Sequence, residues 1–321
     1  MAYLVGTDEA GYGPNLGPLL ISATLWRVPD AMMDQDLYSL CRDSIDSDPV
    51  TSDGADRLVI ADSKVLYKSR GRLRGLEANL LAALGEVGEL PASWLDVWRI
   101  LSPDAVEAFR SIPWYAGFST ALPMDADRAI IDRLRATFHA AQRAAAIRLL
   151  AVRSVALFPS QFNCLVEQRG GKGAVLSEQT LGLVARLIAG LEDEPVLVQC
   201  DKHGGRNRYG ALLQHAFADH VIRVLQESRV CSRYGWGNAS RRVEIRFTAR
   251  GESFLPAALA SMASKYLREL AMMAFNTFWR RHVPGIRPTA GYPADAKRFR
   301  AEIADQQRQL GISDDILWRN R

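Results

Sequence analysis

The sequence has few cysteines, and they form no pattern. Its 321 residues include four, which are far apart and make no CxxC pair: Cys41, Cys164, Cys200 and Cys231. This spacing argues against a disulfide framework and against a zinc ribbon. It favours reduced thiols, as in a cytosolic protein.

Long apolar runs are also missing. A membrane-spanning helix needs about 20 consecutive apolar residues, and no stretch approaches that length. The opening residues, MAYLVGTDEAGYG, have no basic segment before a short apolar run, which argues against a signal peptide. Internal repeats and low-complexity segments are absent as well. We expect a soluble, cytoplasmic protein without a membrane partner, and a monomer by default.

A strong charge imbalance is the third absence. The chain has 40 Lys and Arg against 36 Asp and Glu, giving a net charge of +4 and a pI near 8.9. This balance permits a polyanionic partner without requiring one. With 48% hydrophobic residues, the chain has enough apolar material for a substantial core.

The apolar pattern at the amino terminus predicts a β-hairpin. Residues 3–6 and 19–26 are β-like runs, and the GYGPNLGP segment between them has Pro14 and Pro18, which oppose a helix. Further along, the apolar run PVLVQC at 195–200 predicts a strand that ends at Asp201. Residues 27–57 are polar, and we expect them to leave the core as an insertion.

Helical spacing and capping residues predict most of the remaining elements. We expect one helix to open at Ser69 and continue to Leu84, and another to be capped by Ser177 and run to about residue 190. The other expected helices are 126–151, 209–218, 256–282 and 294–310, and the other expected strands are 152–158, 221–225 and 242–248. Strands first, then strands alternating with helices, predict an α/β fold with a central mixed β-sheet flanked by helices.

Acidic residues stand at places where catalytic groups collect. Asp8 and Glu9 end the first strand, and Gly11 and Gly13 supply the irregularity that adjacent carboxylates need to share one site. Asp201 ends its strand, where ligands gather in α/β sheets.

The helix at 256–282 adds a fourth acid. Ser261, Lys265, Arg268 and Glu269 form a polar stripe apart from the apolar one, so one helix face offers a carboxylate and cations to a shared cleft.

Clustered carboxylates suit a divalent cation. Their hard oxygen ligands favour Mg²⁺ or Mn²⁺, and two such ions support phosphodiester cleavage. Taken singly, the residues have plainer readings. Asp201 also suits a turn or helix cap, and Glu269 suits a solvated position paired with Lys265.

The order of the motifs resembles that of the type 2 ribonuclease H family (ribonucleases HII and HIII). The motifs that carry the resemblance are GTDEAGYGPNLGPLLISA, ADSKVL, VLVQCD, ALASMASKYLRE and WRRHVPGIRPTAGYP, which span residues 3 to about 300. The resemblance implies a ribonuclease H-like fold. It also implies endonucleolytic cleavage of the RNA strand in RNA–DNA hybrids, or in duplex DNA that contains ribonucleotides, by two-metal-ion catalysis that leaves 3′-hydroxyl and 5′-phosphate ends.

The resemblance also implies roles for individual residues. Asp8, Glu9, Asp201 and Glu269 match the four metal-binding catalytic acids. The positions that match substrate-binding residues are Gly11, Tyr12, Gly13, Lys64, Lys265 and Tyr292. The glycine backbone would approach the scissile nucleotide, where only RNA has a 2′-OH. The implied cofactors are Mg²⁺ or Mn²⁺, with two ions bound.

The chain departs from the family at three of these motifs. Tyr12 stands where ribonuclease HII has Arg, Glu269 replaces an Asp, and Lys202 follows Asp201 where the family has Gly. We expect Lys202 either to pair with Asp201 or to contact a phosphate.

The extra length of the chain suggests a division into two parts. We expect a catalytic core at 1–255, with insertions near 27–57, 85–125 and 226–245, and a C-terminal helical region at 256–321 that completes the active site.

Several signals stay open on the sequence alone. The GGKGA segment at 170–174 suits a phosphate-contacting loop or a solvated one, and His203 suits proton transfer or a surface position. The basic run at 68–74 suits nucleic-acid contact or a solvated helix start. The tryptophans in 94–114 suit stacking platforms or burial in an inserted subdomain.

Three hypotheses follow, in order of preference. The first is an active, metal-dependent type 2 ribonuclease H. The second is a non-catalytic nucleic-acid-binding relative, and the third is a nuclease of the same superfamily that acts on other structures, such as branched DNA.

Overall fold

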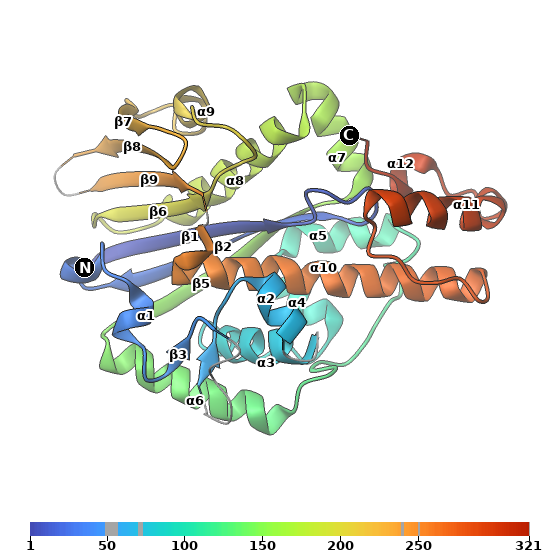
Figure 1. The fold of residues 1–321 in the computed structure, drawn as a ribbon, viewed down its shortest axis with the longest axis horizontal. Coiled ribbons are helices and arrows are strands. Elements are labelled where there is room, and N and C mark those ends of the chain that lie inside the picture. Colours follow the sequence, from blue (N-terminus) through green and yellow to red (C-terminus); the bar gives the residue numbers. More distant parts are fainter. Residues whose placement is uncertain (49–56, 70–72, 239–240, 250, 321) are drawn as a thin grey trace.

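A mixed β-sheet runs through the centre of the molecule (Figure 1). The structure is a computed structural model that describes residues 1–48, 57–69, 73–238, 241–249 and 251–320. The seven strands, in spatial order, are β5 (Arg148–Leu157), β2 (Leu19–Val28), β1 (Ala2–Ala10), β6 (Val196–Asp201), β9 (Arg242–Thr248), β8 (Cys231–Gly237) and β7 (Arg223–Glu227). β1 pairs antiparallel with β2 and parallel with β6, which confirms the predicted hairpin and the predicted mixed sheet.

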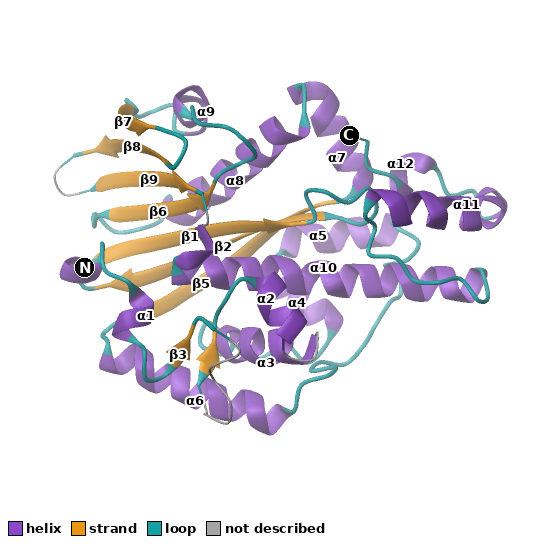
Figure 2. Ribbon diagram, in the orientation of Figure 1, coloured by secondary structure: helices purple, strands orange, loops and turns teal. Residues whose placement is uncertain are grey.

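Helices cover both faces of this sheet (Figure 2). Successive side chains of β1 point to opposite faces, so Leu4 joins one apolar core and Val5 the other. The helices whose side chains join the core of Leu4 are α1 (Leu37–Leu40), α2 (Ser63–Ser69), α3 (Leu73–Leu84), α4 (Trp94–Leu101), α5 (Pro103–Ala108), α6 (Arg128–Ala144), α10 (Leu255–His282), α11 (Pro293–Gln309) and α12 (Asp314–Leu317). Those that join the core of Val5 are α7 (Pro159–Arg169), α8 (Lys172–Ile188) and α9 (Gly210–Ala216).

Smaller elements complete the architecture. Two short strands, β3 (Ile45–Asp46) and β4 (Leu58–Val59), pair with each other outside the central sheet. Three single turns of 3-10 helix are η1 (Asp30–Met32), η2 (Phe109–Ser111) and η3 (Gly251–Ser253). In the part of the chain that the structure describes, no helix is long and apolar enough to cross a membrane.

Helix α10 crosses the centre of the sheet at close range. A Cβ atom on Gly6 of β1 would lie 2.2 Å from the backbone nitrogen of Ala257, so only glycine fits there. The hydroxyl of Thr24 on β2 donates a hydrogen bond of 2.7 Å to the carbonyl of Pro256. Eight residues further along α10, the hydroxyl of Ser264 donates to the carbonyl of Asp8 at 3.1 Å. The crossing therefore sets the middle of α10 beside the carboxyl end of β1.

The segment at 85–125 is a packed aromatic subdomain. Trp94, Trp98 and Trp114 are all buried, and the Trp94 ring lies 4.7 Å from that of Phe109. Because their faces are covered by protein, these rings cannot stack on bases. The expectation of burial is confirmed, and the alternative of stacking platforms is wrong.

A buried carboxylate fixes the end of this segment to the helices. Glu77 of α3 accepts hydrogen bonds from the backbone N–H groups of Met124, Asp125 and Ala126 and from the hydroxyl of Tyr266 on α10. Four donors satisfy a carboxylate that burial would otherwise penalise. The insertion is thus part of the same core as α10.

Two predicted helix starts are wrong. Ser69 ends helix α2 instead of opening a helix, because Asp62 caps α2 earlier by accepting from the N–H groups of Lys64 and Val65. Ser177 lies inside α8, where its hydroxyl donates to the carbonyl of Gly173. A serine can satisfy a carbonyl one turn back as well as cap a helix, and sequence alone does not distinguish these uses.

Other boundaries differ because tertiary pairing overrides local propensity. The helix expected at 126–151 ends at Ala144, and the next strand begins at Arg148. Helix α7 and strand β8 had no predicted counterpart. β8 lies between β7 and β9, so residues 226–245 supply strands to the central sheet. Helix α10 matches the expected helix at 256–282 closely.

The close crossing at Gly6 gives a first prediction. Gly6→Ala should lower the free energy of unfolding by roughly 3 kcal/mol or more, because the new methyl group must push apart two backbones. Urea denaturation measures the change. Gly190→Ala is the matched control, since a Cβ there meets nothing within 4 Å. Equal stability of the two variants would contradict the crossing.

Candidate active site

The carboxyl end of β1 opens into a pocket of about 440 Å³. Its walls come from the segment after β1, from α2, from the middle of α10 and from the segment before α11. The predicted site residues that line it are Asp8, Glu9, Gly11, Tyr12, Gly13, Lys64, Lys265, Glu269 and Tyr292. Asp201 is the one predicted site residue outside this lining.

Asp8 and Glu9 form the acidic centre of the pocket. They are consecutive on β1, yet both line the same cavity. Burial is the main cause that raises the pKa of each carboxyl, and the charge of Asp201 raises both further. The charge of Asp8 also raises the pKa of Glu9, while a hydrogen bond from Ser261 on α10 opposes the shift at Asp8. Nearby positive charge therefore does not offset the effect of burial on the pKa of these two acids.

Strand pairing brings Asp201 to this centre from far along the chain. β1 and β6 are parallel neighbours, and Thr7 pairs with Cys200, so the next residues are Asp8 and Asp201. One oxygen of Asp201 accepts the N–H of Gly251 at 3.3 Å. The prediction that Asp201 ends a strand near Asp8 and Glu9 agrees with this register.

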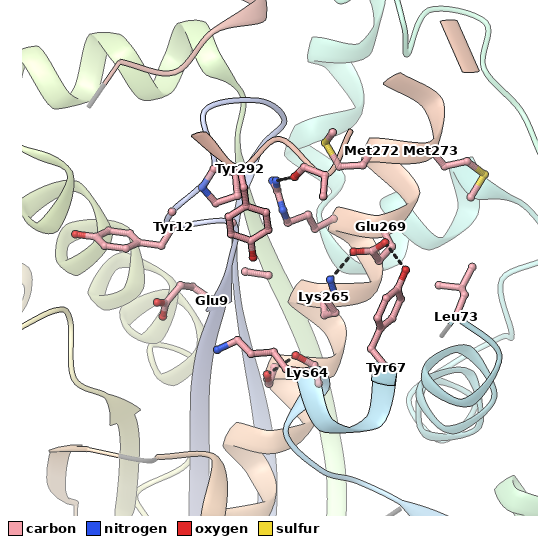
Figure 3. A pocket seen from close by; sticks show the side chains of 18 of the residues that line it. Glu9, Tyr12, Lys64, Tyr67, Leu73, Lys265, Glu269, Met272, Met273 and Tyr292 are labelled. Carbon is pink, nitrogen blue, oxygen red and sulfur yellow. Dashed lines mark hydrogen bonds and ion pairs between the residues drawn. The ribbon is translucent and has the colours of Figure 1, made fainter. Parts of the chain in front are cut away.

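The DSK segment supplies one cation and one further acid. Lys64 lowers the pKa of Glu9 by its charge, and Figure 3 shows its amine directed toward that carboxyl. Asp62 raises the pKa of Asp8. Sequence reasoning missed Asp62, although its place two residues before Lys64 in the quoted motif was the available signal. The hydroxyls of Ser63 and Ser261, 2.9 Å apart, fasten α2 to α10.

Glu269 lies in the same pocket but has partners of its own. Its carboxylate accepts from the amine of Lys265 and, at 2.9 Å, from the hydroxyl of Tyr67 (Figure 3). The amine of Lys265 also lies 4.5 Å from the centre of the Tyr67 ring. The structure thus groups three predicted acids and holds the fourth in a separate ion pair.

The glycine segment after β1 adopts a backbone that requires glycine. Gly11 has a φ of +91°, and a Cβ atom there would lie 2.6 Å from the carbonyl oxygen of Pro18. The buried guanidinium of Arg268 donates to the carbonyls of Pro18 and Leu16, at 2.6 and 3.1 Å. Arg268, which sequence reasoning assigned only to the polar stripe, therefore holds this segment in place.

Two tyrosines flank the pocket in different ways. Tyr292 is 58% exposed and lines the cavity beside Gly13. Tyr12 is directed away from Tyr292, toward the start of α8 (Figure 3). There the amine of Lys172 lies 4.6 Å from the centre of the Tyr12 ring. The last three residues of the 170–174 segment thus begin helix α8, and Lys172 lies against Tyr12.

Lys202 and His203, which follow Asp201 in the chain, both have hydrogen-bond partners within the protein. The amine of Lys202 donates to the Asn207 side chain at 2.7 Å and to the Ser228 carbonyl at 2.6 Å, and in the described residues it forms no ion pair with Asp201. Contact of Lys202 with a phosphate stays a prediction. His203 is buried against Ser177, with 2.9 Å between the ring nitrogen and the hydroxyl. Burial lowers the pKa of His203 to about 3, so it stays neutral and does not sit at the surface. Residues 70–72 of the basic run at 68–74 lie outside the described residues, so both readings of that run stay open.

The donor chemistry fits a divalent cation. Asp8, Glu9 and Asp201 are oxygen donors of like charge, and Lys64 is a cation that acts on Glu9. Among the residues that the structure describes, however, no three His, Cys, Asp or Glu side chains form a ready ligand set. The carboxylates would therefore have to turn toward an ion that binds.

The acidic centre predicts an unusual pH dependence of stability. With EDTA present, the free energy of unfolding should fall as pH rises above about 4. The sign follows because folded Asp8 and Glu9 hold protons that the unfolded chain has already released. Asp8→Asn should flatten this fall by about 1 kcal/mol or more between about pH 5 and about pH 8. Urea denaturation measures it, with Asp43→Asn, an exposed acid, as control. Identical slopes in Asp8→Asn and wild type would contradict the prediction.

Added Mg²⁺ or Mn²⁺ should stabilise the folded chain. At ten times the dissociation constant, mass action raises the free energy of unfolding by about 1.4 kcal/mol. Asp8→Asn should lose most of this gain, because a donor and a negative charge are gone, whereas Asp43→Asn should keep it. Thermal melting with and without the metal checks both. An equal gain in all three proteins would place the ion elsewhere.

Comparison with known proteins gives similarity to solved structures alone. No protein-family model and no curated protein matches the chain. A ribonuclease HII from Archaeoglobus fulgidus, solved in complex with PCNA, is 13% identical with a TM-score of 0.45, and the match covers 99% of this chain and 94% of that one. A ribonuclease H2 from Pyrococcus horikoshii OT3 is 13% identical with a TM-score of 0.42, over 98% of this chain and 92% of that one. A Bst ribonuclease HIII in complex with Mn²⁺ is 14% identical with a TM-score of 0.41, over 99% of this chain and 66% of that one.

Proposed function

We propose that the protein is a divalent-metal-dependent endoribonuclease that cleaves the RNA strand of RNA–DNA hybrids, as a divergent type 2 ribonuclease H. The single observation that carries the proposal is the meeting of Asp8, Glu9 and Asp201 at the carboxyl ends of two adjacent parallel strands. These are three of the four acids that the motif order assigns. Nothing in the local sequence brings Asp201 to within reach of Asp8.

The three acids would hold the metal. Mg²⁺ or Mn²⁺, bound by Asp8, Glu9 and Asp201, supplies activation of a water and stabilisation of the departing oxygen. The protein's own contribution is to keep these carboxylates close together, with the charge of Lys64 acting on Glu9. Ser261 orients the Asp8 carboxylate by its hydrogen bond.

The remaining pocket residues suit a nucleic-acid backbone. Lys64 and Lys265 offer amines that can meet phosphates, and Tyr292 offers an exposed ring beside Gly13. The N–H groups around Gly11 and Gly13 face the substrate in this proposal, where a 2′-OH would distinguish RNA from DNA. The C-terminal region from residue 256 would complete the site, because α10 supplies Ser261, Lys265 and Glu269.

Glu269 stays a prediction as the fourth acid. In the proposed enzyme its ion pair with Lys265 must open before it can bind a metal. If the pair stays closed, Glu269 instead fixes Lys265 and Tyr67 at the pocket wall. Asp62, which acts on Asp8, is the other acid available to the centre.

A labelled RNA–DNA hybrid tests the proposal. The wild type should cut the RNA strand with Mg²⁺ or Mn²⁺ and leave 3′-hydroxyl and 5′-phosphate ends. Asp8→Asn should reduce the rate by about 10²–10⁴-fold, since metal-assisted charge stabilisation contributes several kcal/mol. Asp43→Asn should cut at the wild-type rate. Glu269→Gln shows which role that residue has: a loss like that of Asp8→Asn supports a metal ligand, and a loss of tenfold or less supports a wall residue.

Failure to cut with either metal, or full activity of Asp8→Asn, would overturn the proposal. One observation favours a second candidate, a non-catalytic nucleic-acid-binding relative: the described residues hold no ready metal-ligand set. Salt-dependent binding of the hybrid without turnover would support that candidate.

A further inference from the structure

The C-terminal tail packs against the glycine segment of the pocket. The backbone N–H of Arg319 donates to the carbonyl of Asn15 at 2.8 Å, and the Asn15 side chain donates to the carbonyl of Arg319 at 3.1 Å. Trp318 forms a β-bridge with Leu16. Asn163 of α7 holds the tail from the other side, donating to the Trp318 carbonyl at 2.8 Å. The end of the chain is therefore built into the active-site wall.

The Arg319 side chain reaches the segment directly. It is only 1% exposed, and one of its terminal nitrogens donates to the carbonyls of Gly11 and Pro14. Its guanidinium lies 4.9 Å from the centre of the Phe162 ring. No carboxylate in the described ranges pairs with it. The hydrogen bonds of this cation thus go to two backbone carbonyls of one loop.

Arg319 is poorly suited to a purely stabilising role. Its Nε and Nη1 atoms are buried without any hydrogen-bond partner. Burial and the nearby charge of Arg268 lower its pKa to about 9. Unpaired buried donors and a buried unpaired charge both cost stability, so a hydrophobic residue there would be tolerated by the fold. The hydrogen bonds to the Gly11 and Pro14 carbonyls are therefore the feature that distinguishes an arginine at this position from a hydrophobic residue.

Those contacts decide where the loop's amides point. The peptide unit is planar and trans, so the N–H of Tyr12 points opposite to the carbonyl of Gly11. Arg319 draws that carbonyl into the protein. Within the described chain, the N–H groups of Tyr12 and Gly13 donate to no protein acceptor, and both residues line the pocket. They are donors left available to a ligand.

We propose that Arg319 is a positioning residue, which holds the Gly11–Pro14 loop so that the Tyr12 and Gly13 amides face the sugar–phosphate backbone of the substrate. The inference rests on the proposed function for the identity of that substrate. It extends the site to the last turn of the chain, which no motif in the sequence marks. Arg268 and Arg319 together fix the loop carbonyls at Gly11, Pro14, Leu16 and Pro18.

The test compares Arg319→Met with Arg308→Met, an exposed arginine on α11 that pairs only with its own helix. Arg319→Met should raise KM for the hybrid, and the Kd for hybrid binding, by roughly tenfold, the size of one lost hydrogen bond, and change kcat by less than threefold. Its melting temperature should equal or exceed that of the wild type. Arg319→Lys, which keeps one donor, should have a KM between those of Arg319→Met and the wild type.

The outcomes separate this inference from the proposed function. A folded Arg319→Met with wild-type KM and Kd overturns the positioning role while leaving the nuclease intact. So does a rise in KM matched by a fall in melting temperature that Arg319→Lys does not relieve. If Arg319→Met does not fold, two other variants test the inference. They are Asn163→Ala, which removes a hydrogen bond to the tail, and Arg319→Lys. A wild-type KM in both variants overturns the inference. A wild type that binds hybrid without cutting overturns only the proposed function, and the Kd comparison still tests Arg319.

Discussion

The parallel pairing of β1 with β6, under the crossing of α10, is the constraint on which the rest of the site depends. β1 is the one strand that contacts β2, β6 and α10 at once. Its pairing with β6 sets Asp8 beside Asp201, and its contact with α10 sets Ser261 and Lys265 over the same carboxyl end. Gly6 makes the crossing possible because it has no side chain to hold the helix away. A shift of one residue in the β1–β6 register would send Asp201 to the other face.

The carboxylates and the buried guanidinium groups of the site lie in different places. Carboxylates occupy the end of the sheet, where the charge of Asp201 raises the pKa of both Asp8 and Glu9. Directly behind the glycine loop lie two buried guanidiniums, Arg268 and Arg319, whose donors are directed at backbone carbonyls instead of at the acids. Fixing a loop by its carbonyls leaves its amides outward, as an anionic or hydroxyl-bearing substrate requires. The acidic centre and the amide-lined loop are thus neighbouring parts with different tasks.

Local sequence patterns predicted the elements in which apolar residues recur most regularly. The amino-terminal hairpin, the strand ending at Asp201 and helix α10 have strong apolar periodicity over enough residues to fix their type. Ser177 misled because a serine hydroxyl can donate to the carbonyl one turn back as well as cap a helix. β8 went unpredicted because its residues, CSRYGWG, become a strand only between β7 and β9. The tryptophans of 94–114 had two readings until their packing against Phe109 decided for burial.

By itself, the sequence determined the identity and order of the acids, the place of the glycines after β1 and the long helix that faces them. These are properties of short segments, and short segments carry them in their residue types. Tertiary structure alone decided that Asp201 lies beside Asp8, that Tyr67 donates to Glu269, and that Arg319 reaches Gly11. Each of these depends on which distant backbones come within hydrogen-bonding distance. That is set by strand register and helix crossing, since neighbouring residues along the chain hold no record of partners that lie hundreds of positions away.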